Sequence, residues 1–326
     1  MPTEQPASGA RSPAATPAVS VVVAAYNAAE FIGDTLASVF AQTFEDFELI
    51  LVNDGSPDTA ELESALAPYL ERVVYVRQEN RGAGAARNRA LREARAPLVA
   101  FLDADDQWLP TYLEEQVAFL DSGGYDLVYA DAEIFGDPPF AGRTFMETAP
   151  SEGEVNFASL VSGRCNVITS GVVARRSLVI EVGLFDERLR NSQDFDLWIR
   201  MIRAGAGAGY RRKVLLRYRH HAASLSGDAA NRVARELIVL DKIETYDLTS
   251  VERAEVSRAK ERVRANMDLE SGKQHLAGGR FGEAREAFGR ANASRKSWKL
   301  RAVVLALRVA PRLVLWLTER RRPESS

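Results

Sequence analysis

The sequence is poor in the residues that build disulfides and zinc sites. It has one cysteine, Cys165, and three histidines among 326 residues. A single cysteine forms no intrachain disulfide and no cysteine-based metal site, which favours a reducing compartment. With so few histidines, any metal centre must rely on carboxylates, and these favour hard cations such as Mg2+ or Mn2+ over zinc.

Long apolar runs are missing as well. No stretch of about 20 uncharged apolar residues is present, so the sequence predicts no transmembrane helix. Residues 1–18 are rich in Ala, Pro, Ser and Thr, and they lack a basic start followed by an apolar stretch. We therefore expect a disordered tail there and not a signal peptide. The overall composition, 46% hydrophobic and 27% charged, is typical of a soluble globular protein.

Charge is distributed unevenly along the chain. Residues 251–326 contain 18 Lys and Arg against 9 Asp and Glu, whereas residues 1–250 contain 24 against 36. An acidic body does not suit a nucleic-acid binder, so no nucleic-acid partner is predicted. A basic C-terminal part suits an anionic surface such as lipid headgroups.

Short apolar runs alternate with amphipathic stretches from Val19 onward. The predicted strands are 19–25, 47–53, 72–76 and 96–104, and the predicted helices between them are 28–42, 58–70 and 83–95. This alternation predicts βαβ units, and therefore an α/β fold with a mostly parallel central sheet flanked by helices. Ligands of such sheets bind at the carboxyl ends of the strands.

The pattern changes after residue 135. A Gly- and Pro-rich connection at 136–153 precedes a strand near 171–175, a helix near 193–204 and a strand near 213–218. From about 228 the sequence predicts successive helices, and 277–291 resembles one unit of a helical-repeat hairpin. We expect a first domain at 19–227 and a helical C-terminal region at 228–326.

Polar residues follow two of the predicted strands. The first is Asp103-Ala104-Asp105-Asp106, which is followed by a predicted helix start at 108–110. Its three carboxylates repel one another, which is electrostatically costly unless they share a cation. In the turn Asn53-Asp54-Gly55-Ser56, Asp54 could accept hydrogen bonds from a base or a ribose, while Gly55 would let a ligand approach the backbone. The alternatives are an aspartate-rich helix cap and an ordinary Asp-Gly turn.

A third candidate lies where the helix near 83 begins. Residues 81–88, RGAGAARN, combine two glycines with two arginines. A helix N-terminus beside guanidinium groups stabilises a phosphate. The segment matches neither the G-x-G-x-x-G pattern nor a P-loop, so neither kind of nucleotide site is predicted. A flexible loop with a solvated basic rim is the alternative.

These motifs occur together and in a specific order. SVVVAAYNAAEFIGDTLASVFAQTFEDFELILVNDGSPDTA, ENRGAGAARNRAL and FLDADDQWLP are followed by SGVVARRSLVIEVGLFDERLRNSQDFDLWIRM and RYRHHAASLS. Together they resemble family 2 glycosyltransferases, which have the GT-A fold, over residues 19–226. The resemblance implies an inverting, metal-dependent enzyme that moves a sugar from a nucleotide-diphosphate sugar, expected to be a UDP-sugar, to an acceptor hydroxyl. The expected acceptor is a glycan or a lipid-linked molecule in bacterial-type surface glycan synthesis.

The resemblance also implies roles for individual residues. It assigns donor binding to Ala25, Tyr26, Asn27, Asp54, Arg81, Gly82, Arg87, Asp103, Ala104 and Asp105. Asp105, Asp106 and His221 would hold the Mg2+ or Mn2+ ion, with His221 matching the pattern Y-R-x-H better than His220. A structural histidine is the alternative for His221.

The general base is expected at the start of the helix near 193. Asp194 matches the aspartate of the family's Glu-Asp pair, although Gln193 replaces the usual Glu. The alternative for Asp194 is a helix cap. Two other protein classes also stay open. A non-catalytic sugar-nucleotide-binding or scaffold protein would lose carboxylates that this sequence keeps, and a nucleotidyltransferase would need a glycine-rich basic loop where AAYNAAEF stands.

The stretch 300–322 predicts a basic amphipathic terminal helix. Arg301, Arg308 and Arg312 recur at i, i+7 and i+11, and Pro311 should kink the helix. Such a helix suits the interface of an anionic membrane, which predicts a cytoplasmic protein at the inner face of the plasma membrane. Docking on its own domain or on another copy in a homo-oligomer is the alternative.

Overall fold

The computed structural model describes residues 16–221 and 229–319. Residues 1–224 and residues 225–326 form two compact units, and each is described by itself. The predicted tail up to residue 15, the junction at 222–228 and the arginines after residue 319 lie outside the described residues.

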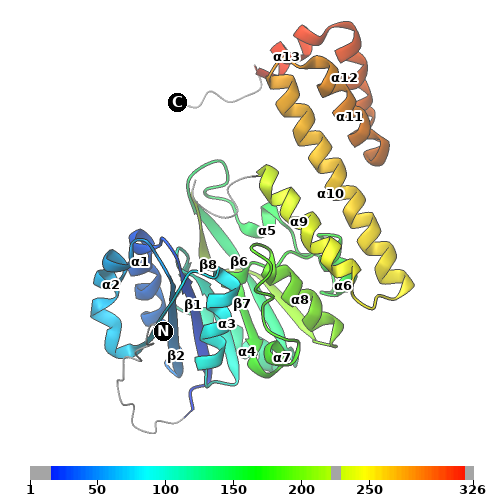
Figure 1. Cartoon of the computed structure of the whole chain (residues 1–326). Helices are drawn as coiled ribbons and strands as arrows, with labels where there is room; N and C mark the ends of the chain where they lie inside the picture. The colour runs from blue at the N-terminus through cyan, green and yellow to red at the C-terminus, as the bar shows by residue number, and fades with distance from the viewer. Residues whose placement is uncertain (1–15, 222–228, 320–326) are drawn as a thin grey trace. The chain divides into compact units, whose positions relative to one another are not determined.

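Within residues 16–221, a single sheet of eight strands forms the centre of the first unit (Figure 1). The strands are β1 (Val19–Ala25), β2 (Phe47–Asp54), β3 (Val73–Gln78), β4 (Leu98–Asp103), β5 (Gln107–Trp108), β6 (Leu127–Gly136), β7 (Val172–Arg175) and β8 (Ala208–His220). Their order is β3-β2-β1-β4-β7-β6-β8-β5. β7 and β5 run antiparallel to their neighbours, and the other pairs are parallel. The predicted α/β fold with a mostly parallel sheet is confirmed.

Helices cover both faces of this sheet. They are α1 (Ala29–Phe40), α2 (Thr59–Leu66), α3 (Ala83–Glu93), α4 (Tyr112–Gly123), α5 (Phe145–Thr148), α6 (Phe157–Val161), α7 (Arg176–Glu181) and α8 (Gln193–Arg203), with 3-10 turns η1 (Ala67–Arg72) and η2 (Thr169–Gly171). Side chains alternate along a strand, so each strand contributes to two apolar layers. Val21 and Val23 of β1 belong to the layer with α1, α2 and α4. Phe101 of β4 packs instead against Trp198 of α8 and against Phe185, which follows α7 in the chain.

Strands β5 and β6 differ from the sequence expectation. The segment 107–108 forms strand β5 beside β8, and the helix expected at 108–110 begins at Tyr112. Trp108 is buried because its ring stacks on Tyr112 at 4.2 Å and its indole N–H donates to the Ser170 carbonyl. The ten-residue strand β6 was not predicted at all. The sequence of β6 does not alternate between apolar and polar residues in the usual way, because six consecutive residues, Leu127 to Ala132, are buried.

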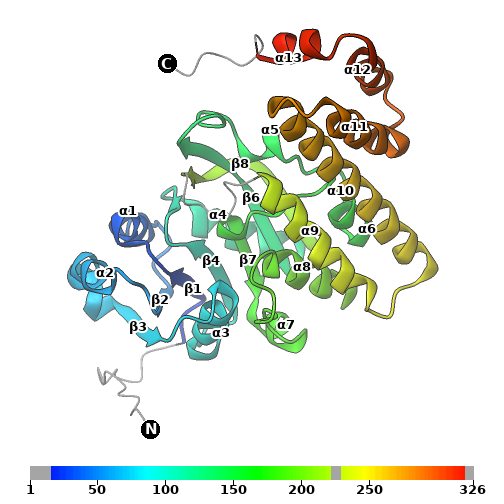
Figure 2. The same cartoon turned by 45° about the horizontal axis from the view of Figure 1, so that its top comes forward.

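The described second unit, residues 229–319, is helical (Figure 2). Its helices are α9 (Ala229–Glu244), α10 (Ser250–Ala277), α11 (Phe281–Arg295), α12 (Trp298–Val309) and α13 (Pro311–Glu319). α10 and α11 form a hairpin, in which Leu276 of α10 packs with Ala284 and Phe288 of α11; the expected hairpin unit at 277–291 covers only its turn and most of α11. Leu307 of α12 completes this apolar cluster. None of the helices in the described ranges has the length and apolar character needed to cross a membrane.

The terminal helix is interrupted instead of kinked. α12 ends at Val309, and Pro311 is the first residue of α13. Proline has no backbone N–H and suits the first helical position, where that donor would stay unused. The single arginine stripe predicted for one continuous helix is therefore not formed. Arg301 and Arg308 lie on α12 and Arg312 on α13.

Two glycines give a matched test of packing between α10 and α11. A methyl group on Gly272 would lie 2.7 Å from the Phe288 ring, whereas one on Gly289 would meet no described atom within 4 Å. Gly272→Ala should therefore destabilise the helical unit by about 1–3 kcal/mol. Gly289→Ala should stabilise it by about 0.5–1 kcal/mol, because alanine has less backbone entropy to lose in a helix. Chemical unfolding of the full chain, followed by circular dichroism, measures both, and effects of equal sign would contradict this packing.

Candidate functional site

The carboxyl ends of β1, β2 and β4 lie side by side. The register pairs Ala25 of β1 with Asn53 of β2, and Ala24 of β1 with Asp103 of β4. The parallel sheet therefore gathers the strand-end motifs, which are far apart in the sequence, at one edge.

The turn after β1 is joined to the turn after β2. The Asn27 backbone N–H donates to Ser56 Oγ at 2.6 Å. Asn27 has a φ of 51°, a left-handed conformation that asparagine tolerates better than most residues. Tyr26 beside it is exposed, while Ala25 is buried. The turn thus presents Tyr26 outward at the edge of the sheet.

Asp54 holds the loop that leads into α3. Its carboxylate is buried and accepts hydrogen bonds from Gln78 Nε2 at 2.7 Å, Arg81 N–H at 3.0 Å and Gly82 N–H at 2.8 Å. Two of these donors are backbone groups directly before the helix, so Asp54 fixes the loop that contains both residues. Its predicted role in donor binding stays a prediction beside this structural one.

The fold of the chain itself requires glycine at position 55. Its φ is +65°, and a Cβ there would lie 2.6 Å from the backbone nitrogen of Asn80. The close approach is therefore made by the chain's own backbone. The expectation that Gly55 lets a ligand approach the backbone stays a prediction beside this structural role.

The two arginines of the segment 81–88 lie in different environments. Arg81 is exposed and pairs with Glu187 at 2.7 Å. The side chain of Arg87 is 10% exposed, and its Nη2 lies 2.5 Å from Asp103 Oδ1. Arg81 therefore has the exposure expected for a solvated basic rim, whereas Arg87 lies in the interior of the site.

A buried guanidinium, that of Arg87, lies at the centre of the site. Burial alone would lower the pKa of Arg87, but the charges of Asp103, Asp194 and Asp105 outweigh burial and raise that pKa. Asp103 contacts Arg87 directly, and the charges of Asp194 and Asp105 act on the same guanidinium. The structure thus brings the predicted base together with the predicted donor-binding segment.

Asp105 faces His221. Its Oδ2 lies 3.0 Å from His221 Nε2. Burial raises the pKa of Asp105 and the charge of Asp103 adds to this effect, while the bond to His221 opposes it. The neighbouring carboxylates of Asp103 and Asp105 bring negative charge together, and carboxylate oxygens are suitable ligands for Mg2+ or Mn2+. No cluster of three potential metal ligands occurs in the part of the chain that the structure describes, so the shell would need oxygens from water or a bound diphosphate.

Asp106 is engaged within the protein. It is fully buried, its Oδ1 accepts the Arg219 N–H at 2.8 Å, and its Oδ2 accepts the Ser170 hydroxyl. Burial, together with the charges of Asp105 and Asp103, raises the pKa of Asp106 well above its usual range. These contacts give Asp106 a structural role, and its predicted role as a metal ligand stays a prediction beside it.

Asp194 lies in the first turn of α8. Its Oδ2 accepts the Thr169 hydroxyl at 2.7 Å, and its Oδ1 accepts the Phe195 N–H at 2.8 Å. The second contact satisfies one free N–H of the helix start, but the N-cap position itself is Ser192, so Asp194 is not the helix cap of the alternative. Asp196 is fully buried and pairs with Arg200 at 2.9 Å, so it is a structural residue.

Sequence reasoning missed the turn η2. Thr169 holds Asp194, while Ser170 holds Asp106 and also accepts the backbone N–H of Asp103 at 3.1 Å. One short turn thus connects the carboxylates after β4 with α8. Serine and threonine are common residues, and their position just before the strand predicted at 171–175 was the available signal.

Gln193 fills the contact between α3 and α8. A Cβ on Gly84 would lie 3.3 Å from Gln193 Cγ, so glycine allows the two helices to approach. Gln193 is buried, and its Oε1 has no hydrogen-bond partner among the described residues. An ionised glutamate there would add negative charge beside Asp194, whereas glutamine adds none.

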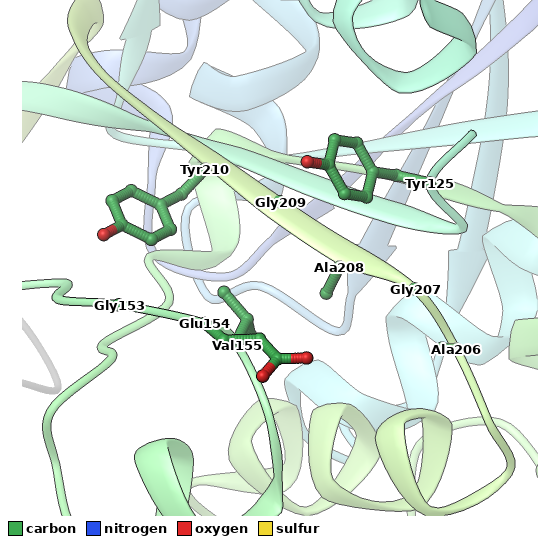
Figure 3. Close-up of a pocket in the computed structure, with 9 residues that line it drawn as sticks. All are labelled: Tyr125, Gly153, Glu154, Val155, Ala206, Gly207, Ala208, Gly209 and Tyr210. Atoms are coloured by element: carbon green, nitrogen blue, oxygen red, sulfur yellow. The ribbon is translucent and has the colours of Figure 1, made fainter. Parts of the chain in front are cut away.

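A cavity of about 400 Å3 lies at a different place (Figure 3). It is lined by Tyr125, Gly153, Glu154, Val155 and residues 206–210. β6 and β8 begin at Leu127 and Ala208, and β6 runs in the same direction as β4. The cavity is therefore at the amino ends of these strands, at the edge of the sheet opposite Asp103.

A matched pair of arginines tests the charge balance. Arg87→Gln removes the cation among buried carboxylates and should cost about 3–5 kcal/mol in the free energy of unfolding. Arg89, two residues further along α3, is partly exposed and pairs with Glu93 at 3.1 Å. Arg89→Gln should change that free energy by less than about 0.5 kcal/mol. Chemical unfolding of both variants measures the difference, and a loss as small for Arg87 as for Arg89 would contradict its central role.

Sequence comparison finds related glycosyltransferases. The Escherichia coli protein UDP-Glc:alpha-D-GlcNAc-diphosphoundecaprenol beta-1,3-glucosyltransferase WfaP is 29% identical over 69% of this chain and 86% of its own length. Uncharacterized glycosyltransferases of Rickettsia felis and Rickettsia bellii are 27% and 28% identical over 66% and 63% of this chain. The chain spans 36% and 30% of the length of these two relatives.

Structural comparison confirms the predicted GT-A fold. S. aureus TarS 1-349 in complex with UDP matches 94% of this chain and 93% of its own, with 19% identity and a TM-score of 0.57. Mannosyltransferase PcManGT from Pyrobaculum calidifontis, in complex with GDP-Man and Mn2+, matches 95% and 85%, with 20% identity and a TM-score of 0.61. Residues 20–219, more than half of the chain, match the family model "Glycosyl transferase family 2". The chain belongs to glycosyl transferase family 2.

Proposed function

We propose that this chain transfers a sugar from a nucleotide-diphosphate sugar to an acceptor hydroxyl, with inversion at the anomeric carbon. The observation that carries this proposal is the position of Asp194. The carboxylate of Asp194 is partly buried, is held by Thr169 and acts, like Asp103 and Asp105, on the charge of Arg87. A base beside a donor site is what single-displacement transfer to a hydroxyl requires.

In the proposed reaction, Asp194 accepts the proton of the acceptor hydroxyl as that oxygen attacks the anomeric carbon. The Thr169 hydroxyl donates to Asp194 Oδ2 and so fixes the direction of the carboxylate. A divalent cation held by Asp105 and His221 would neutralise the departing diphosphate. No covalent glycosyl-enzyme intermediate is needed, because a single displacement inverts the configuration.

The donor is proposed to lie at the carboxyl ends of β1, β2 and β4. Tyr26 and Asn27, the loop fixed by Asp54, and Asp103-Ala104-Asp105 surround this edge of the sheet. A UDP-sugar is the donor to test first, because WfaP is named for UDP-Glc and TarS was crystallised with UDP and with UDP-GlcNAc. GDP-Man, present in the PcManGT structure, is the alternative.

The acceptor is proposed to be a saccharide on a lipid diphosphate. WfaP, which this chain matches over 86% of that protein's length, is named for such an acceptor. The proposed pathway is synthesis of a surface glycan. Release of free UDP or GDP on addition of a diphosphoundecaprenol-linked saccharide tests the donor and the acceptor together. Donor binding without release under any of these conditions would instead favour the non-catalytic sugar-nucleotide-binding or scaffold alternative.

Asp194→Asn tests the base. The amide oxygen can still accept the Phe195 N–H and the amide nitrogen can donate to Thr169, so the shape is kept while the proton acceptor is lost. Turnover should fall about 100-fold or more, with donor affinity in calorimetry unchanged. As a control, Asp121→Asn alters an exposed carboxylate of α4 and should change neither quantity. Equal losses of rate and donor affinity would show that Asp194 supports the donor site instead.

Metal dependence has its own test. EDTA should abolish turnover, and Mn2+ or Mg2+ should restore it. Asp105→Asn should reduce the rate by about 100-fold, or about 3 kcal/mol in activation free energy, and should remove the effect of Mn2+ on UDP affinity. Full activity in EDTA would contradict a role for the ion in catalysis.

A further inference from the structure

Exposed apolar side chains are concentrated on α12 and α13. Of the twelve large hydrophobic residues that are exposed in the described part of the chain, six lie on these two helices. They are Trp298, Leu305 and Val309 on α12, and Leu313, Trp316 and Leu317 on α13. Trp298 is 74% exposed and Val309 is 87% exposed. Scattered apolar residues are normal on a protein surface, but a cluster of them marks an interaction site.

α12 has two opposite apolar faces. Leu300, Val303, Val304 and Leu307 pack on the cluster formed with α10 and α11. At about 100° per residue, these four residues centre about 180° away from Trp298. Leu305 and Val309 lie within about 20° of Trp298 on the helix circumference, so the three form a narrow outer stripe. The packing within the helical unit therefore accounts for the inner face and leaves the outer stripe exposed.

Basic side chains flank the outer stripe. Arg301 and Arg308 lie about 60–80° to one side of Trp298, and Lys299 lies about 100° to the other side. Both arginines and Lys299 are exposed. Between Glu286 and Glu319 the sequence has seven Lys and Arg residues and no Asp or Glu. A partner that fits this surface therefore has an apolar region that the stripe can enter and negative charges beside it.

We propose that the outer face of α12 and α13 binds the surface of an anionic lipid bilayer. The apolar stripe would enter the boundary between headgroups and acyl chains, while the arginines contact lipid phosphates. Helices of 12 and 9 residues are too short to span a bilayer but can lie in its interface. A symmetric contact between two copies would instead place these arginines against each other. This inference does not rest on the proposed function.

Tryptophan fluorescence separates the proposed surface from the first unit. Of the four tryptophans, Trp108 and Trp198 are buried, whereas Trp298 and Trp316 are exposed. Vesicles of phosphatidylglycerol and phosphatidylcholine should shift the emission of the full chain to shorter wavelength and should protect it from acrylamide. Vesicles of phosphatidylcholine alone should bind at least tenfold more weakly, and added salt should weaken binding to the anionic vesicles.

Matched variants assign the binding to the stripe. Leu305→Ser with Val309→Ser should reduce cosedimentation with anionic vesicles at least tenfold, because apolar area is lost from the contact. Val251→Ser changes another exposed valine, on α10, and should leave binding within about twofold. Arg301→Gln with Arg308→Gln should weaken binding to anionic vesicles about thirtyfold, because each basic residue near the surface contributes about 1 kcal/mol.

Three results would overturn the proposal. The full chain could stay in the supernatant with anionic vesicles, or the stripe variants could bind as well as the unaltered chain. Light scattering without vesicles could also show a dimer that Leu305→Ser with Val309→Ser dissociates, which would make the face a contact between copies. Calorimetry with UDP on the same variants keeps the outcome separate from that of the proposed glycosyl transfer.

Discussion

The site depends on one buried cation among several carboxylates. Arg87 is contributed by α3, Asp103 by β4 and Asp194 by α8, so their electrostatic interaction ties together three elements that are far apart in the sequence. Removing carboxylates from water is costly, and a guanidinium close by offsets much of that cost. One positive charge does not balance Asp103, Asp105 and Asp194 together. A divalent ion, bound together with a diphosphate, would balance the remaining negative charge.

The hydrogen bonds divide the carboxylates into two groups. Asp54, Asp106 and Asp196 are buried, and contacts inside the chain hold them in place. They fix the loop before α3, the segment after β4 and the start of α8. Asp105 and Asp194 are less completely enclosed. The buried group therefore forms a rigid support, and the proposed function places the chemistry on the two carboxylates that are less enclosed.

Sequence patterns predicted the parts of the fold that depend on local regularity. The strands β1 to β4 and the intervening helices follow from apolar runs and helical spacing, and the strand-end position of Asp103 follows from them. Contacts made in the folded chain were not predictable in this way. Gly55 meets the backbone of Asn80, and Ser170 meets Asp106, over separations of 25 and 64 positions. Trp108 lies in a strand because it pairs with Leu216 of β8, and its side chain is enclosed by Tyr112 and Ser170.

The proline at 311 converts a predicted long helix into two short ones, and this changes what the basic end of the chain can do. A continuous amphipathic helix would present one stripe, whereas α12 and α13 each present an apolar face of their own. Because α12 also packs inward through Leu300 and Leu307, its outer face is held by the fold of the helical unit. A lipid-linked acceptor is confined to a bilayer. An enzyme held at the same surface would search for that acceptor in two dimensions, and this gives the proposed transfer and the proposed binding surface a common physical setting.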